Sequence, residues 1–119
     1  MQYTIDVEGE FLRVKVSGRS EDRSPSEVCA AILSESEKQG RKRILIELDQ
    51  QAPLSATSQY ELVKRLPELG FTPEHRIALV HRRAEMQKAN DFLNVLAGNR
   101  GVGLRNFPVV EQAKAWLRE

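Results

Sequence analysis

Three hydroxyl side chains crowd a short stretch that follows an apolar run. Ser55, Thr57 and Ser58 lie within four residues, and Asp49 precedes them. Hydroxyl oxygens can accept hydrogen bonds from the unpaired N–H groups at the start of a helix, or they can help to hold a phosphate there. Capping needs only one or two of them. We therefore regard capping as the simpler interpretation and a ligand-binding or phosphorylation role for the surplus as the alternative.

A histidine and two arginines, His81-Arg82-Arg83, close a second apolar run. If both runs are parallel strands, their carboxyl ends and the helix starts after them lie at one edge of the sheet. Hydroxyls, guanidinium groups and a positive helix end suit a small anion or a phosphopeptide. The predicted ligand or partner site consists of Asp49, Ser55, Thr57, Ser58, His81 and Arg82.

We expect Leu54 to be buried and Ser55 or Thr57 to cap the second helix. At least one other hydroxyl of the cluster should then be accessible at the same edge as Asp49 and His81, because one cap leaves its neighbours redundant.

Catalytic and metal-binding motifs are missing from the sequence. It has no G-x-S-x-G, no P-loop and no dinucleotide-binding fingerprint. His75 and His81 do not stand at metal-ligand spacing with Cys29 or with paired carboxylates, so we predict neither a metal nor a cofactor. We favour a non-enzymatic binding protein. The enzymatic alternative has His81 act with Ser55 or Thr57, which requires a hydrogen bond of roughly 2.6–3.2 Å between them.

Local signals predict the elements that position these residues. Two alternating runs around Gly9 predict a β-hairpin. Ser24-Pro25-Ser26-Glu27 forms a capping box and Gly40 suits a left-handed C-cap, which together predict a helix over residues 25–39. The apolar runs at 44–48 and 76–81 lack strict alternation, as expected for strands covered on both faces.

The remaining elements alternate in the same way. One helix has the apolar stripe Leu62, Val63 and Leu66 and ends near Pro67 and Gly70, and a second has a stripe from Met86 to Ala97 and ends at Gly98-Asn99. A short strand follows from Val102 to Phe107. Pro108 then opens a last helix with the stripe Val110, Ala113 and Leu117. This order, β-β-α-β-α-β-α-β-α, predicts one α/β domain over residues 1–119 with a mostly parallel sheet and an N-terminal antiparallel hairpin.

Composition narrows the classes of function. The formal net charge of +1 argues against nucleic acid as a partner. No apolar run approaches the roughly 18 residues of a membrane span, and the first residues do not resemble a signal peptide. One cysteine, Cys29, suits a reducing compartment and lies in an apolar helical run, so we expect a cytoplasmic protein with a buried structural thiol. The basic run at 41–43 is interpreted as a solvated strand end. The sequence leaves a homodimer open.

Several strings, in this order, resemble the bacterial SpoIIAA-like proteins of the STAS-like superfamily. They are KRILIEL at 42–48, LSATSQYELVKRL at 54–66, RIALV at 76–80, NRGVGLRNF at 99–107 and AKAWL at 113–117. The resemblance covers nearly the whole chain. It implies a small α/β domain that acts by binding, and in the anti-anti-sigma factors of this group docking onto an anti-sigma kinase is switched by serine phosphorylation.

The resemblance also carries a site and two alternatives. Where the family motif reads Asp-Ser-Ser-Gly, this chain reads Ser55-Ala56-Thr57-Ser58. The resemblance therefore implies Thr57 or Ser58 as phosphate acceptors in a switched regulator, as an alternative to a constitutive binder of a protein partner or small anionic ligand. A lipid carrier is a minor alternative, since this group is similar to the CRAL-TRIO fold; it requires a large apolar cavity.

Overall fold

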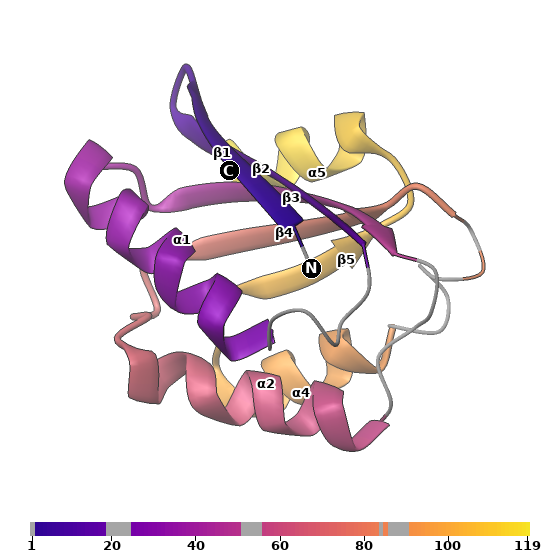
Figure 1. Cartoon of the computed structure of the whole chain (residues 1–119). Helices are drawn as coiled ribbons and strands as arrows, with labels where there is room; N and C mark the ends of the chain where they lie inside the picture. The colour runs from indigo at the N-terminus through magenta and orange to yellow at the C-terminus, as the bar shows by residue number, and fades with distance from the viewer. Residues whose placement is uncertain (1, 19–24, 51–55, 84, 86–90) are drawn as a thin grey trace.

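The computed structural model describes residues 2–18, 25–50, 56–83, 85 and 91–119. The elements are β1 (Gln2–Glu8), β2 (Phe11–Gly18), α1 (Pro25–Gln39), β3 (Arg43–Gln50), α2 (Ala56–Leu69), β4 (Arg76–His81), α4 (Phe92–Arg100), β5 (Leu104–Phe107) and α5 (Val110–Leu117) (Figure 1). The described elements follow the predicted order of strands and helices, and the predicted α/β class is confirmed.

The five strands form a single mixed sheet in the sequential order β1-β2-β3-β4-β5. Strands β1 and β2 are antiparallel and turn at Gly9, whose φ of 59° is left-handed. The pairs β2–β3, β3–β4 and β4–β5 are all parallel. The predicted combination of an antiparallel hairpin with parallel strands is therefore confirmed.

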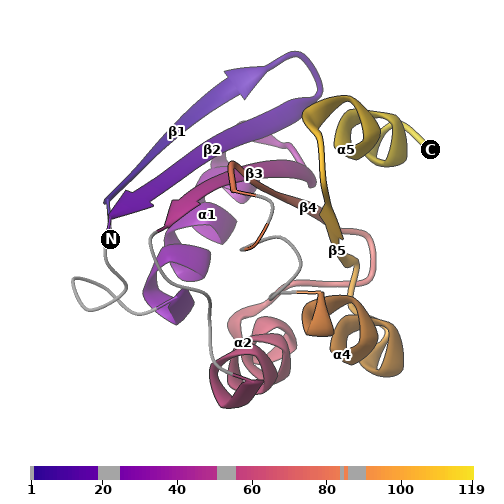
Figure 2. The same cartoon turned by 90° about the vertical axis from the view of Figure 1, so that its right-hand side faces the viewer.

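Crossover handedness decides which face each helix covers. Every parallel connection moves one strand further in the same direction, and such connections are right-handed. Helices α1, α2 and α4 consequently lie together on one face, while α5, which follows the last strand, lies on the other (Figures 1 and 2).

The two central strands are buried on both faces, as their uninterrupted apolar runs predict. Ile44 and Ile46 of β3 belong to the larger core, under α1, α2 and α4. Leu45 points the opposite way, into a smaller core with Ala113 and Leu117 of α5. All three β3 side chains are buried.

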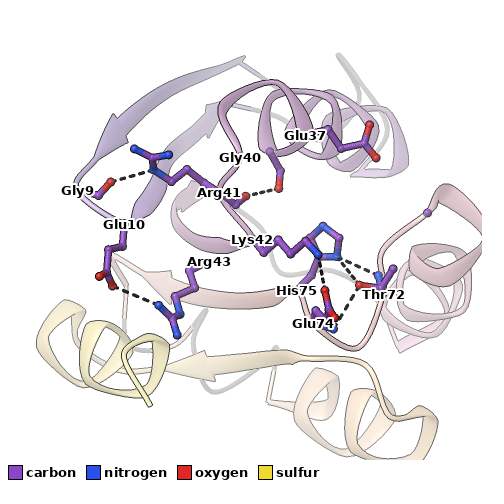
Figure 3. Close-up of a pocket in the computed structure, with 12 residues that line it drawn as sticks. Gly9, Glu10, Glu37, Gly40, Arg41, Lys42, Arg43, Thr72, Glu74 and His75 are labelled. Atoms are coloured by element: carbon purple, nitrogen blue, oxygen red, sulfur yellow. Dashed lines mark hydrogen bonds and ion pairs between the residues drawn. The ribbon is translucent and has the colours of Figure 1, made fainter.

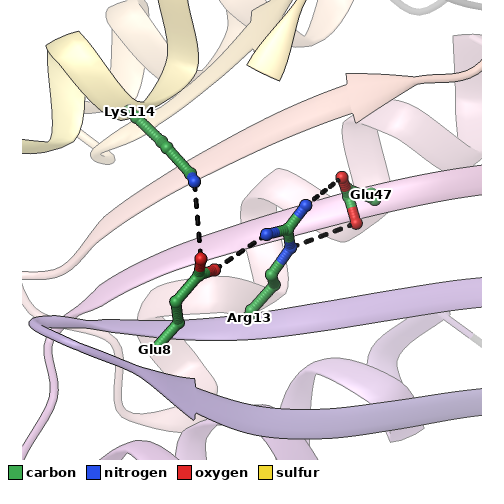
Figure 4. Close-up of polar contacts among 4 residues, drawn as sticks. All are labelled: Glu8, Arg13, Glu47 and Lys114. Atoms are coloured by element: carbon green, nitrogen blue, oxygen red, sulfur yellow. Dashed lines mark hydrogen bonds and ion pairs between the residues drawn. The ribbon is translucent and has the colours of Figure 1, made fainter. Parts of the chain in front are cut away.

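Helix α5 covers only part of its face of the sheet, and a cluster of charges lies beside it (Figure 4). The Arg13 guanidinium donates to Glu47 over 2.9 Å and to Glu8 over 2.9 Å, and Lys114 of α5 lies 3.5 Å from Glu8. The Arg13 hydrogen bond lowers the pKa of Glu8 below its usual range, and the two carboxylates raise the pKa of Arg13. The cluster links the hairpin to β3 and α5 through ion pairs.

The boundaries of α1 agree with local capping signals, whereas the end of α4 and the start of α5 differ from the predicted ones. Helix α1 spans the predicted residues and ends at Gly40, whose φ is 65°. The helix with the stripe from Met86 to Ala97 was predicted to end at Gly98-Asn99, and this prediction is wrong. Helix α4 continues to Arg100 and is capped by Gly101, whose φ is 66°.

Backbone bonds explain why Gly101 ends α4. The N–H of Gly101 donates to Gly98 and that of Val102 donates to Ala97, which is the Schellman arrangement. Val102 then packs against the larger core, so the last strand begins at Leu104 and not at Val102.

Helix α5 likewise starts at Val110, two residues after Pro108, because Val109 is still extended.

Cys29 lies on α1, half-buried against the larger core. Burial raises the pKa of its thiol to about 12. The thiol therefore stays protonated near neutral pH, which agrees with the predicted structural role.

Gly103 is required by a close approach of two backbones. A Cβ at this position would lie 2.3 Å from the carbonyl oxygen of His75. We expect Gly103→Ala to lower the free energy of unfolding by about 1–3 kcal/mol, as overpacking does. Gly98→Ala is the matched control, since its Cβ would meet nothing within 4 Å and alanine favours a helix. Urea unfolding of both variants checks this, and equal stabilities would contradict it.

Candidate functional site

Strands β3 and β4 end side by side and bring three of the predicted site residues together. Leu48 pairs with His81, and the Arg82 N–H donates to the Leu48 carbonyl over 3.0 Å. The Arg82 Nη1 lies 3.6 Å from the Asp49 Oδ2. The Arg82 side chain is nevertheless 75% exposed. We call this part of the molecule the carboxyl edge.

His81 occupies an internal position at this edge. It is the last residue of β4, and its side chain is buried. Burial lowers its pKa, while a hydrogen bond with Asn106 and the charge of Asp91 partly oppose that effect. Asn106 is itself held by two side chains at the start of α4. Its Nδ2 donates to Oδ1 of Asp91, the residue before the helix, over 3.1 Å, and its backbone N–H donates to Oδ1 of Asn94 over 2.7 Å. His81 therefore faces this internal network, and direct binding by His81 stays a prediction.

The hydroxyl cluster is described only in part. Thr57 and Ser58 lie in the first turn of α2, and both are exposed, so the expected accessible hydroxyl is present. The helix start lies on the same side of the molecule as the ends of β3 and β4 (Figure 1). Leu54 and Ser55 lie outside the described residues, as does the predicted cap by Ser55.

The strand order affects what the carboxyl edge can do. Ligand crevices in open parallel sheets form where the strand order reverses and the helices on either side diverge. The described strands run in sequence without a reversal. Asp49 and Arg82 therefore lie on an open edge of the sheet, and no crevice of this kind forms between the described strands.

A hollow of about 810 Å³ lies at the opposite edge of the sheet, where β3 and β4 begin (Figure 3). We call it the amino-edge hollow. Its walls come from the β1–β2 turn, the α1–β3 connection and the α2–β4 connection, and include Gly9, Gly40, Arg41, Thr72 and His75. The site predicted from the sequence does not include this hollow. The one signal for it in the sequence was the basic run 41–43 beside Gly40, since these residues line the hollow.

Each residue of the basic run contacts a different group. Arg41 donates to the carbonyls of Gly9 over 3.0 Å and Gln39 over 2.8 Å. Lys42 forms an ion pair with Glu74, and Arg43 lies 3.2 Å from Glu10. The interpretation of this run as a solvated strand end is therefore incomplete, because these side chains also join the connections that surround the hollow.

His75 forms a buried part of the hollow wall. The Thr72 N–H donates to its Nδ1 over 3.0 Å, so the neutral ring carries its proton on Nε2. Burial lowers the pKa of His75, and the positive charge of Lys42 lowers it further. The hydrogen bond from Lys42 lowers the pKa of the neighbouring Glu74. Near neutral pH the wall thus presents an uncharged imidazole beside charged side chains.

No protein-family model matches the sequence, and no curated protein matches it significantly. No helix among the described residues is long and apolar enough to cross a membrane.

Both buried histidines should make stability depend on pH. Their folded pKa values are lowered from 6.5, so the unfolded chain binds protons more readily below that pH. The stabilising contribution is complete above pH 6.5 and is lost as the pH falls toward the folded pKa values. Urea midpoints measured downward from pH 8 should decline in this window, with a shallower slope in His81→Gln. NMR titration midpoints of both imidazoles above 6.5 would contradict the assignment.

Proposed function

We propose that the chain is a non-enzymatic binding module of the STAS-like type, which binds an anionic group on a small ligand or a protein partner at the carboxyl edge. The observation that carries the proposal is the state of Arg82. Its guanidinium is largely exposed, and its acidic neighbour Asp49 lies 3.6 Å away, beyond a short hydrogen bond. Arg83 beside it is also exposed.

The neighbouring helix start supports the same ligand chemistry. The first turn of α2 leaves backbone N–H groups directed outward and carries a partial positive charge. Thr57 and Ser58 add exposed hydroxyls there. The α/β class of the domain also agrees with what the resemblance to SpoIIAA-like proteins implies.

Two alternatives receive less support. An enzyme that uses His81 would need the imidazole directed toward a hydroxyl, whereas His81 is buried and hydrogen-bonded with Asn106. A lipid carrier would need a large apolar cavity, whereas the amino-edge hollow is lined by charged side chains such as Arg41 and Glu74.

Removal of the Arg82 charge should weaken anion binding. We expect Arg82→Gln to raise the dissociation constant for inorganic phosphate about three- to tenfold, the scale of an exposed charge pair. Arg65→Gln, which removes an exposed arginine from α2, is the matched control and should leave the constant unchanged. NMR titration at low ionic strength measures both. Equal affinities in the two variants, or no phosphate binding by the wild type, would refute the proposal.

A phosphorylation-switched regulator is the second candidate, favoured by the exposure of Thr57 and Ser58 in the first turn of α2. A phosphate there adds nearly two negative charges on the same side of the molecule as Asp49 and Arg82 and would repel an anionic partner.

Intact-mass measurement of the protein purified from its native cells tests the switch. The candidate predicts a species heavier by one phosphate that disappears in the double variant Thr57→Ala with Ser58→Ala. A phosphate that persists in the double variant, or none under any growth condition, would exclude Thr57 and Ser58 as the switch.

A further inference from the structure

The sheet has two outer strands, and they differ in how they are protected against further pairing. Strand β5 has only four residues and carries the exposed Arg105, and short length and charge are usual ways to blunt a sheet edge. Strand β1 has seven residues, pairs with β2 in an unbroken register, and contains neither a proline nor a basic residue. None of the strands that the structure describes lies on its outer side (Figure 2). The outer side of β1 is therefore a template for another strand.

The two faces of β1 determine what kind of strand can join it. Tyr3 and Ile5 pack against the larger core, and Val7 follows them on the same face with 45% of its surface exposed. Thr4 and Asp6 are exposed on the opposite face. A strand that continues the sheet must place apolar side chains beside the first set and polar side chains beside the second.

A second copy of β1, running antiparallel, meets this requirement when Ile5 lies opposite Ile5 of the other copy. Tyr3 then lies opposite Val7, Thr4 lies opposite Asp6, and all seven residues of β1 are paired. A shift by one residue would place apolar side chains opposite polar ones. A shift by two residues pairs fewer of them, and in one direction it places Asp6 opposite Asp6, which is destabilising. The sequence of β1 is thus complementary to itself in one register.

We infer that the chain forms a two-fold symmetric dimer in which β1 pairs with β1 of a second copy and joins the two sheets into one. Such a contact uses the same surface on both copies, so it closes on itself and assembly stops at two. The formal net charge of +1 opposes association little. The contact involves no residue of the carboxyl edge, so the dimer stands independently of the anion binding proposed there.

Charge changes at Thr4 test both the dimer and its register. The dissociation constant of the dimer is measured by sedimentation equilibrium from micromolar to millimolar protein concentration. Thr4→Asp places a like charge opposite Asp6 twice in each dimer, and we expect it to raise the constant about three- to tenfold. Thr4→Lys places an opposite charge there and should lower the constant by a similar factor. Since Thr4 is exposed, both variants should fold.

Asn99→Asp is the matched control for net charge. It changes an exposed residue of α4, a helix that packs against β5 at the other edge of the sheet, and should leave the dissociation constant unchanged. Val95→Lys alters the most exposed large apolar side chain of α4 and should also have no effect.

Four results would overturn the inference. They are a wild-type chain that stays monomeric at millimolar concentration, an assembly larger than a dimer, equal constants for Thr4→Asp and Asn99→Asp, and dissociation of the dimer by Val95→Lys. Circular dichroism verifies the fold of each variant. If Thr4→Asp fails to fold, Thr4→Lys decides alone, and a constant no lower than that of the wild type then contradicts the predicted register.

Discussion

Crossover handedness acting on a sequential strand order is the constraint on which the rest of this structure depends. Three parallel connections of one hand place α1, α2 and α4 on the same face. The other face of β3 and β4 is equally apolar, so α5 must return over it to bury Leu45 and Ala78. Where α5 does not reach, the sheet carries ionised side chains, and Arg13 links them across β1, β2 and β3.

The same constraint determines the character of the two edges. Without a reversal of strand order, the carboxyl edge stays open and offers exposed groups such as Arg82, which suits a partner that docks from outside. At the amino edge, the hairpin turn and two helix-to-strand connections surround a hollow. Buried His75 and the backbone contact at Gly103 hold one of these connections in place.

Local signals in the sequence predicted what local physics determines. The boundaries of α1 follow from Pro25 and Gly40, and the burial of Ile44, Leu45 and Ile46 follows from an apolar run without alternation. The end of α4 was mispredicted because Gly98 and Gly101 are both glycines, and only the docking of Val102 into the core selects the second.

Parts of the site depend on contacts between residues far apart in the chain. Asp49 and Arg82 were predicted to meet because parallel strands end at a common edge, and they do. The internal position of His81 depends on Asn106 and α4, which no local pattern connects to it. The amino-edge hollow needs Gly9, Arg41 and Glu74 from separate connections, and strand order, which periodicity does not encode, brings them together.

Residue-by-residue mapping of anion binding tests the central claim, that the carboxyl edge is the docking surface, most directly. Inorganic phosphate is titrated into the isotope-labelled protein while every backbone amide resonance is followed. The account predicts that the largest shifts occur at Arg82, Arg83 and the first turn of α2, including Thr57 and Ser58. Shifts confined to residues 41–43 and 72–75, with the amides of Arg82, Arg83, Thr57 and Ser58 unmoved, would contradict it.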